Sequence, residues 1–196
     1  MRIEERADGL HIYGYVNVTG KISRPVITPH GKCVETIEER AFAKAIEASG
    51  DIAVSVDHDK THAYASTKTG TLKLKEDAIG LHADVLITDP TVIEMAKKGR
   101  IRGWSFGMYN VIDKLEQRAE GELPLRRISG LMLDHITLVV NKNPCYAATS
   151  VEYRADEGDC LVEQRAIDIM PELCIIPSEN KPDLSDYEKR LEALKR

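Results

Sequence analysis

The chain has 196 residues, of which 42% are hydrophobic and 30% are charged, a composition typical of a soluble globular protein. No run of 18 apolar residues is present and the first ten residues lack the apolar stretch of a secretory leader, so we expect no membrane partner and a cytoplasmic protein. The net charge of −5 lies wholly in residues 155–196, and the neutral remainder has no basic stripe, which argues against a nucleic-acid partner.

The first part of the chain predicts strands and one helix. Alternating apolar and polar residues predict a strand over 9–18, whereas the turn-rich residues 23–36 are typical of a loop. Helical spacing of apolar residues from Ile37 onward predicts a helix within 36–50. Residues 51–59 predict a short apolar strand that runs into a polar turn.

The next part predicts a hairpin, a second helix and two long strands. Two alternating segments around a turn predict a hairpin over 69–88. Residues 89–99 predict a short helix with Asp89 as its N-cap and a glycine after its end. Residues 100–117 and 126–140 predict strands. Many strands with few short helices favour an α+β fold, an antiparallel barrel or sandwich.

The boundary between body and tail is placed at residue 154. Residues 155–196 are acidic, and their apolar residues keep no clean period before position 183. Over 183–195 one narrow apolar stripe predicts a short amphipathic helix, which is marginal alone and is expected to dock on the body or on a partner. The stripe consists of Leu184, Tyr187, Leu191 and Leu194.

The strand over 100–117 carries a serine between two large aromatic residues, in the stretch "GWSFG". Gly103 and Gly107 lie two residues before and after Ser105, on the same face of a strand, and leave room beside its hydroxyl for a substrate backbone. The stretch is not a nucleophile elbow, because the following residues predict more strand rather than a helix. Ser105 is therefore either a satisfied core serine or a nucleophile.

His58 lies between two aspartates at the end of the short strand over 51–59. It is either part of a polar surface turn or a general base oriented by a carboxylate. A metal site built from His58, Asp59 and His62 is disfavoured, because the i, i+4 spacing of the histidines converges only on a helix. The four cysteines form no CxxC pair and are interpreted as free thiols.

Asp134 and His135 interrupt the apolar strand over 126–140. Neighbours in a strand point to opposite faces, so only one of the two is expected to face inward. That residue either joins a buried hydrogen-bond network or completes a triad with His58 and Ser105. His11, His30 and His82 are assigned structural or surface roles.

Five segments in order resemble the prohead maturation proteases of tailed bacteriophages, which are similar to the herpesvirus assemblins. They are "AFAKAI", "VSVDHD", "TGTLKLKEDAIGLHADVLI", "KKGRIRGWSFGMYNV" and "LMLDHITLVVNKNPCYAAT", and they span about residues 35–150. The resemblance implies a mostly antiparallel β-barrel with a few short flanking helices, and a serine protease domain over 1–154.

The resemblance also implies roles for individual residues. Ser105 resembles the family's nucleophile and His58 its catalytic histidine. Asp134 stands where the family usually has Glu and is preferred as third member, with His135, which replaces a Ser, as the alternative. An arginine-bearing loop in the assemblins implies Arg127, with Arg126, as an oxyanion contributor, but the favoured interpretation of the two is a surface arginine pair that flanks a strand.

The resemblance implies a serine endopeptidase of virion maturation without a cofactor. Its substrate would be the capsid scaffold or the scaffolding segment of the major capsid protein, and it would also cleave itself, inside the immature phage capsid in the bacterial host. The tail would be a removable targeting extension or a solvated C-terminus, and a homodimer is expected. The alternatives are a non-catalytic assembly or scaffolding protein on the same fold and a metal-dependent hydrolase.

Overall fold

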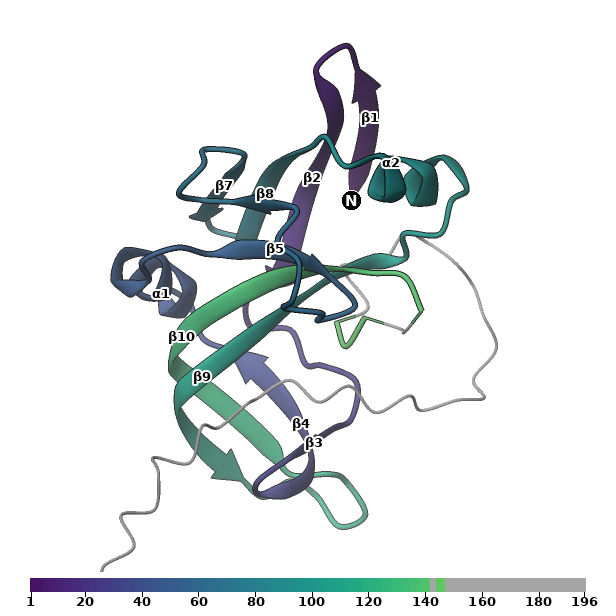
Figure 1. Cartoon of the computed structure of the whole chain (residues 1–196). Helices are drawn as coiled ribbons and strands as arrows, with labels where there is room; N and C mark the ends of the chain where they lie inside the picture. The colour runs from purple at the N-terminus through teal and green to yellow at the C-terminus, as the bar shows by residue number, and fades with distance from the viewer. Residues whose placement is uncertain (142–143, 147–196) are drawn as a thin grey trace, which may run out of the picture.

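The computed structural model describes residues 1–141 and 144–146, which form ten strands and two short helices (Figure 1). The elements in chain order are β1 (Arg2–Arg6), β2 (Gly9–Val18), β3 (Val26–Thr28), β4 (Gly31–Ile37), α1 (Ala41–Ala48), β5 (Ala53–Val56), β6 (Ala65–Ser66), β7 (Leu72–Glu76), β8 (Gly80–Ile87), α2 (Pro90–Lys97), β9 (Gly103–Glu116) and β10 (Leu125–Val139).

The strands form two sheets. One has the order β1-β2-β8-β7 and is antiparallel throughout. The other has the order β3-β4-β10-β5-β6, with β9 paired to β10. The long strands β9 and β10 run side by side through the molecule, from the level of β5 to the level of β3 and β4 (Figure 1).

Strand β10 organises the second sheet because it has three partners. It pairs with β9 antiparallel along its length, with β4 parallel through its first residues, and with β5 parallel through its last residues. The prediction of mostly antiparallel pairing is confirmed, and the two exceptions are the parallel pairs β10–β4 and β10–β5. Strand β2 also contacts β9 across the two sheets, and closure of the sheets into a barrel stays a prediction.

Several predicted elements are confirmed. The strand over 9–18 is β2, the hairpin over 69–88 is β7–β8, and the two long strands are β9 and β10. The cap of α2 is also as predicted, since Asp89 accepts hydrogen bonds from the backbone N–H groups of Thr91 and Val92.

Other predictions are wrong. Residues 23–36 are not a loop, because β3 and β4 form a hairpin there, closed at Gly31 with a φ of 90°. Helix α1 begins at Ala41, and Ile37 is the last residue of β4. Strands β1 and β6 were not predicted, since one is mostly charged and the other has two residues.

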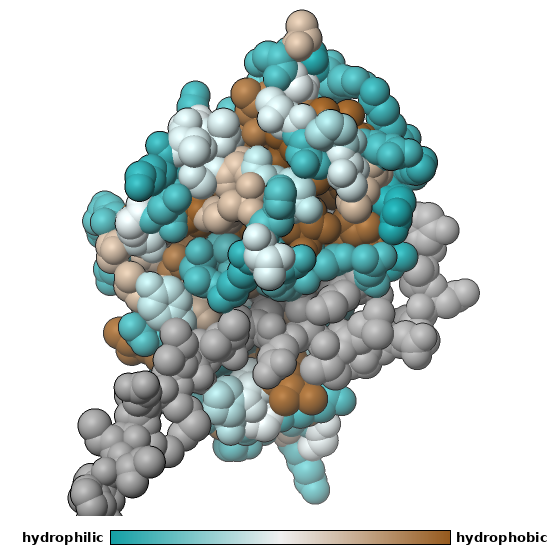
Figure 2. Space-filling view, viewed as in Figure 1, coloured by the Kyte–Doolittle hydropathy of each residue, from teal (hydrophilic) through white to brown (hydrophobic). Residues whose placement is uncertain are grey.

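Apolar residues from both sheets form the core, while a few large ones remain exposed. On the face shown in Figure 2, hydrophobic side chains reach the surface between hydrophilic ones.

Neither described helix has the length and apolar character needed to cross a membrane. Cys33 and Cys145 form no disulfide in the described part of the chain, in agreement with the prediction for these two. The acidic extension over 155–196, its helix over 183–195, and the remaining two cysteines lie outside the described residues.

Candidate active site

Strands β9 and β10 bring the small and polar residues of the motifs onto one face of the sheet. Ser105 lies opposite Thr137, and Gly107 lies opposite His135. Directly opposite residues share a face, as do residues two apart in one strand. The residues on either side of Ser105, Trp104 and Phe106, point to the other face and belong to the core. The alternation therefore leaves the serine and histidine together on the polar side.

The turn after β5 places His58 in contact with Thr137 and His135 on this face of the sheet. Asp57 and His58 both have left-handed backbones, with φ values of 48° and 64°. The carboxylate of Asp57 accepts hydrogen bonds from the N–H groups of Val140 and Asn141 at the end of β10. The backbone N–H of His58 donates to Thr137 Oγ1 at 3.1 Å. These bonds hold a strained turn in place, a feature that clusters at functional sites.

The two histidines are joined directly. His58 Nδ1 and His135 Nε2 are 2.8 Å apart, and the rings meet edge to face with centroids 5.0 Å apart. On its other side His135 Nδ1 lies 2.8 Å from Asp134 Oδ2, and Lys60 forms an ion pair with the same carboxylate. A ring nitrogen makes one hydrogen bond in the ring plane. Because His58 Nδ1 is bonded to His135, it is not bonded to Asp134, the residue that the sequence analysis preferred as third member.

A β-bulge explains how adjacent residues of one strand meet side by side. The pairing of β10 with β9 shifts between Leu133 and His135, so Asp134 lies at an irregularity. A bulge changes the direction in which side chains leave the strand. Only His135 of the two is buried, as expected, but at this irregularity the partly exposed Asp134 carboxylate still reaches the His135 ring.

Gly107 has a different role from the one predicted. A Cβ atom there would lie 2.3 Å from His135 Cε1 and 2.6 Å from its Nδ1. The space above Gly107 is therefore filled by the His135 ring and not left open for a substrate backbone. Gly103 pairs with Val139 at the end of the same ladder.

Burial and charge set the protonation of this cluster. His135 is 5% exposed, and burial lowers its pKa, an effect that the hydrogen bond to Asp134 only partly offsets. Burial raises the pKa of Asp134, but hydrogen bonds from Lys60 and His135 outweigh it, so the net shift is downward. At neutral pH the pair is thus a neutral imidazole against a carboxylate.

Ser105 is fully buried. A substrate carbonyl can reach its hydroxyl only if neighbouring groups move. The predicted hydrogen-bond contact between Ser105 Oγ and a ring nitrogen of His58 stays a prediction, and the ladder places both residues next to Thr137.

The arginines of the sequence hypothesis lie elsewhere. Arg127 forms an exposed ion pair with Glu116. In β10, Arg127 precedes Thr137, the residue opposite Ser105, by ten residues, which corresponds to about 30 Å along the strand. The structure does not bring it to Ser105. Arg126 is not a surface residue, since it is 1% exposed and pairs with Asp113.

In the part of the chain that the structure describes, no three His, Cys, Asp or Glu side chains are placed to hold a metal ion. The ring of His62 packs against Tyr64, and its neighbour Asp59 accepts hydrogen bonds from Thr61. His11 and His82 contact Asp8 and Tyr15, consistent with structural roles.

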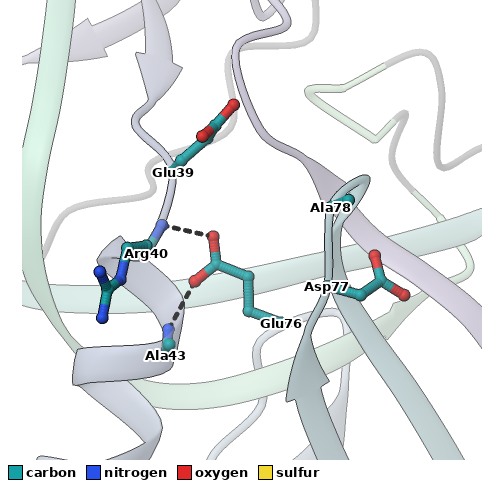
Figure 3. Close-up of a pocket in the computed structure, with 6 residues that line it drawn as sticks. All are labelled: Glu39, Arg40, Ala43, Glu76, Asp77 and Ala78. Carbon is teal, nitrogen blue, oxygen red and sulfur yellow. Dashed lines mark hydrogen bonds between the residues drawn. The ribbon is translucent and has the colours of Figure 1, made fainter.

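A surface pocket of about 380 Å³ lies away from these residues, between α1 and the β7–β8 turn (Figure 3). Within it the Glu76 carboxylate accepts hydrogen bonds from the backbone N–H groups of Arg40 and Ala43. Arg40 precedes the helix with a φ of 67° and supplies no side-chain cap. Glu76 therefore replaces the missing N-cap of α1, a structural role that the sequence did not reveal.

A comparison of the sequence with known protein families shows to which family the chain belongs. A family model, caudovirus prohead serine protease, matches residues 1–163. The chain belongs to this family. No curated protein and no solved structure was found to match the chain. The family is one of serine proteases of capsid maturation, as the sequence predicted, and its members act in the immature capsid of the phage.

Proposed function

We propose that this prohead protease homologue is a serine endopeptidase with Ser105 as nucleophile, His58 as general base and His135 as third member. The observation that carries the proposal is the hydrogen bond between His58 and His135 beside the strand of Ser105. The assemblin-like barrel expected from the sequence is part of the proposal, supported by the contact of β2 with β9 across the sheets.

The chemistry follows from acyl transfer. His58 takes the proton of Ser105 Oγ as that oxygen attacks a peptide carbonyl carbon, and a tetrahedral intermediate forms. The imidazolium of His58 is stabilised through its Nδ1–H by His135. It then returns the proton to the leaving amine, and the acyl-enzyme is hydrolysed by water with the same base. The buried surroundings of Ser105 and His135 strengthen each hydrogen bond in this sequence.

The substrates proposed are the capsid scaffold or the scaffolding segment of the major capsid protein, and the chain itself. Family membership supports a capsid substrate. The burial of Ser105 supports an enzyme that is latent until it rearranges, and dimerisation is the proposed trigger.

Coexpression tests this function. The full chain, wild type or Ser105→Ala, is produced with its major capsid protein, and both proteins are analysed by intact mass spectrometry. We expect truncation of the capsid protein only with wild type. Truncation at the same rate with Ser105→Ala means that Ser105 is not the nucleophile. Correctly assembled particles without any truncation favour a non-catalytic assembly protein instead.

A further inference from the structure

The hydrogen bonds of the cluster continue beyond the three proposed catalytic groups. They run from His58 to His135, from His135 to Asp134, and from Asp134 to Lys60. Asp134 is 34% exposed and Lys60 is 44% exposed, whereas His135 is almost fully buried. The chain of contacts thus leads from the buried strand pair to the protein surface.

The direction of these bonds is fixed from the carboxylate end. An ionised carboxylate only accepts, so His135 must donate from Nδ1 to Asp134. A neutral His135 then has a lone pair on Nε2 and accepts from His58 Nδ1–H. A neutral His58 with its proton on Nδ1 has its lone pair on Nε2, and that is the tautomer that takes a proton from a serine.

We propose that Asp134, held by Lys60, is a positioning residue that sets the tautomers of both histidines and keeps Nε2 of His58 unprotonated, so that this nitrogen can act as the base. This inference rests on the proposed function and extends it by one residue beyond the triad. Asp134 acts through His135 and does not itself receive the serine proton. The downward shift of the Asp134 pKa and of the His135 pKa keeps both groups in the required state at neutral pH.

The opposite charges of Asp134 and Lys60 predict opposite shifts in the pH dependence of activity when each is removed. The groups that face His135 are His58, Asp134 and Lys60. Removing the negative charge with Asp134→Asn destabilises the imidazolium form of the histidine pair, so the acid limb of activity moves to lower pH. Removing the positive charge with Lys60→Met has the reverse effect and moves the limb to higher pH.

Activity is read as the rate at which a fluorophosphonate probe labels the full chain. Asp134→Asn lowers this rate by roughly 10- to 100-fold, less than the loss of about 10⁴-fold when a carboxylate directly beside the catalytic histidine is removed. Asp134→Glu restores most of the rate. The control is Asp84→Asn, which removes an exposed carboxylate of β8 and leaves the rate and pH limb unchanged.

Tautomers are read independently of any reaction. Nitrogen-15 NMR of histidine-labelled full chain, with His58→Gln and His135→Gln for assignment, reports which ring nitrogen carries the proton. We expect Nδ1–H on both rings in wild type and in Ser105→Ala, and loss of the single tautomer of His58 in Asp134→Asn. A proton on Nε2 of His58 in wild type overturns the inference.

The outcomes separate the two proposals. If Ser105→Ala is labelled as fast as wild type, the proposed function fails while the tautomers still test the role of Asp134. If labelling requires Ser105 but Asp134→Asn and Lys60→Met leave the pH limb in place, the positioning role fails alone. Should Asp134→Asn not fold, the exposed Lys60→Met variant decides by the same limb.

Discussion

The two ends of the β9–β10 pair bury polar side chains in different ways. At one end Arg126 lies between Asp113, with which it forms an ion pair, and Glu35, whose Oε2 is 3.8 Å from its Nη1. At the other end His135 is buried against His58, with Asp134 behind it. Both clusters include residues of β10, and each has an almost fully buried member there, Arg126 in one and His135 in the other.

The difference lies in which groups can exchange a proton. A guanidinium stays charged under all physiological conditions, so the Arg126 cluster is a fixed arrangement of charges whose role is to hold β4, β9 and β10 together. An imidazole can both accept and release a proton, so the His135 cluster can move a proton. We therefore expect damage at the first cluster to affect folding and damage at the second to affect activity.

The largest expected effect is that of Ser105→Ala on activity. Loss of a serine nucleophile lowers activity, read as the rate of probe labelling, by on the order of 10⁴-fold or more. Stability changes by less than about 1 kcal/mol, since a small residue replaces a small residue in a strand. Probe labelling and urea denaturation of the same preparation measure the two quantities. A large loss of stability in this variant would erase the contrast between the clusters.

Next in size is Arg126→Met. It leaves the buried Glu35 carboxylate and the partly buried Asp113 carboxylate without their cation and is expected to lower the free energy of unfolding by about 3–5 kcal/mol. The matched control is Arg127→Met, the adjacent exposed residue, with a change within about 0.5 kcal/mol. Urea denaturation gives both values, and equal effects would mean that the Arg126 cluster does not stabilise the fold.

Gly107→Ala comes third. The added methyl group displaces the His135 ring, and a shift of about 1 Å in a catalytic group costs about 10²-fold in rate. Gly130→Ala in β10 is the control, because its Cβ would meet only the exposed side chain of Ile112, at 3.1 Å. If both variants label at the wild-type rate, His135 does not orient the base.

The smallest effect is on the pH dependence of stability. The pKa of His135 is lower in the folded chain than the 6.5 of a free side chain, so below that value the unfolded chain binds more protons. Stability therefore falls as pH decreases from 7 to 5. His135→Gln removes this contribution and should give a shallower decline in urea denaturation. An unchanged slope would contradict the assigned burial of the imidazole.

Much of the fold could be predicted because local pattern decided it. The alternation in β2, β8 and β9 and the Asp89 cap of α2 need no information from distant residues. The cap of α1 could not be predicted, because Glu76 lies 33 residues beyond Ala43 and only the fold brings them together.

The site shows the same limit. The motifs around Ser105 and His58 pointed to residues that share one region of the sheet, and Gly107 was singled out, although for the wrong occupant. The order of Asp134 and His135 was not accessible, because strict alternation of side chains fails at the bulge between Leu133 and His135. Parallel pairing of β5 with β10, which brings His58 to His135, also has no local signal.

The most direct test of the central claim is the site at which a fluorophosphonate modifies the full chain. Peptide mapping by mass spectrometry should place the phosphonyl adduct on Ser105, with labelling abolished in His58→Ala and strongly reduced in His135→Ala. An adduct on another serine, or labelling of Ser105 that does not depend on His58, would contradict the proposed site.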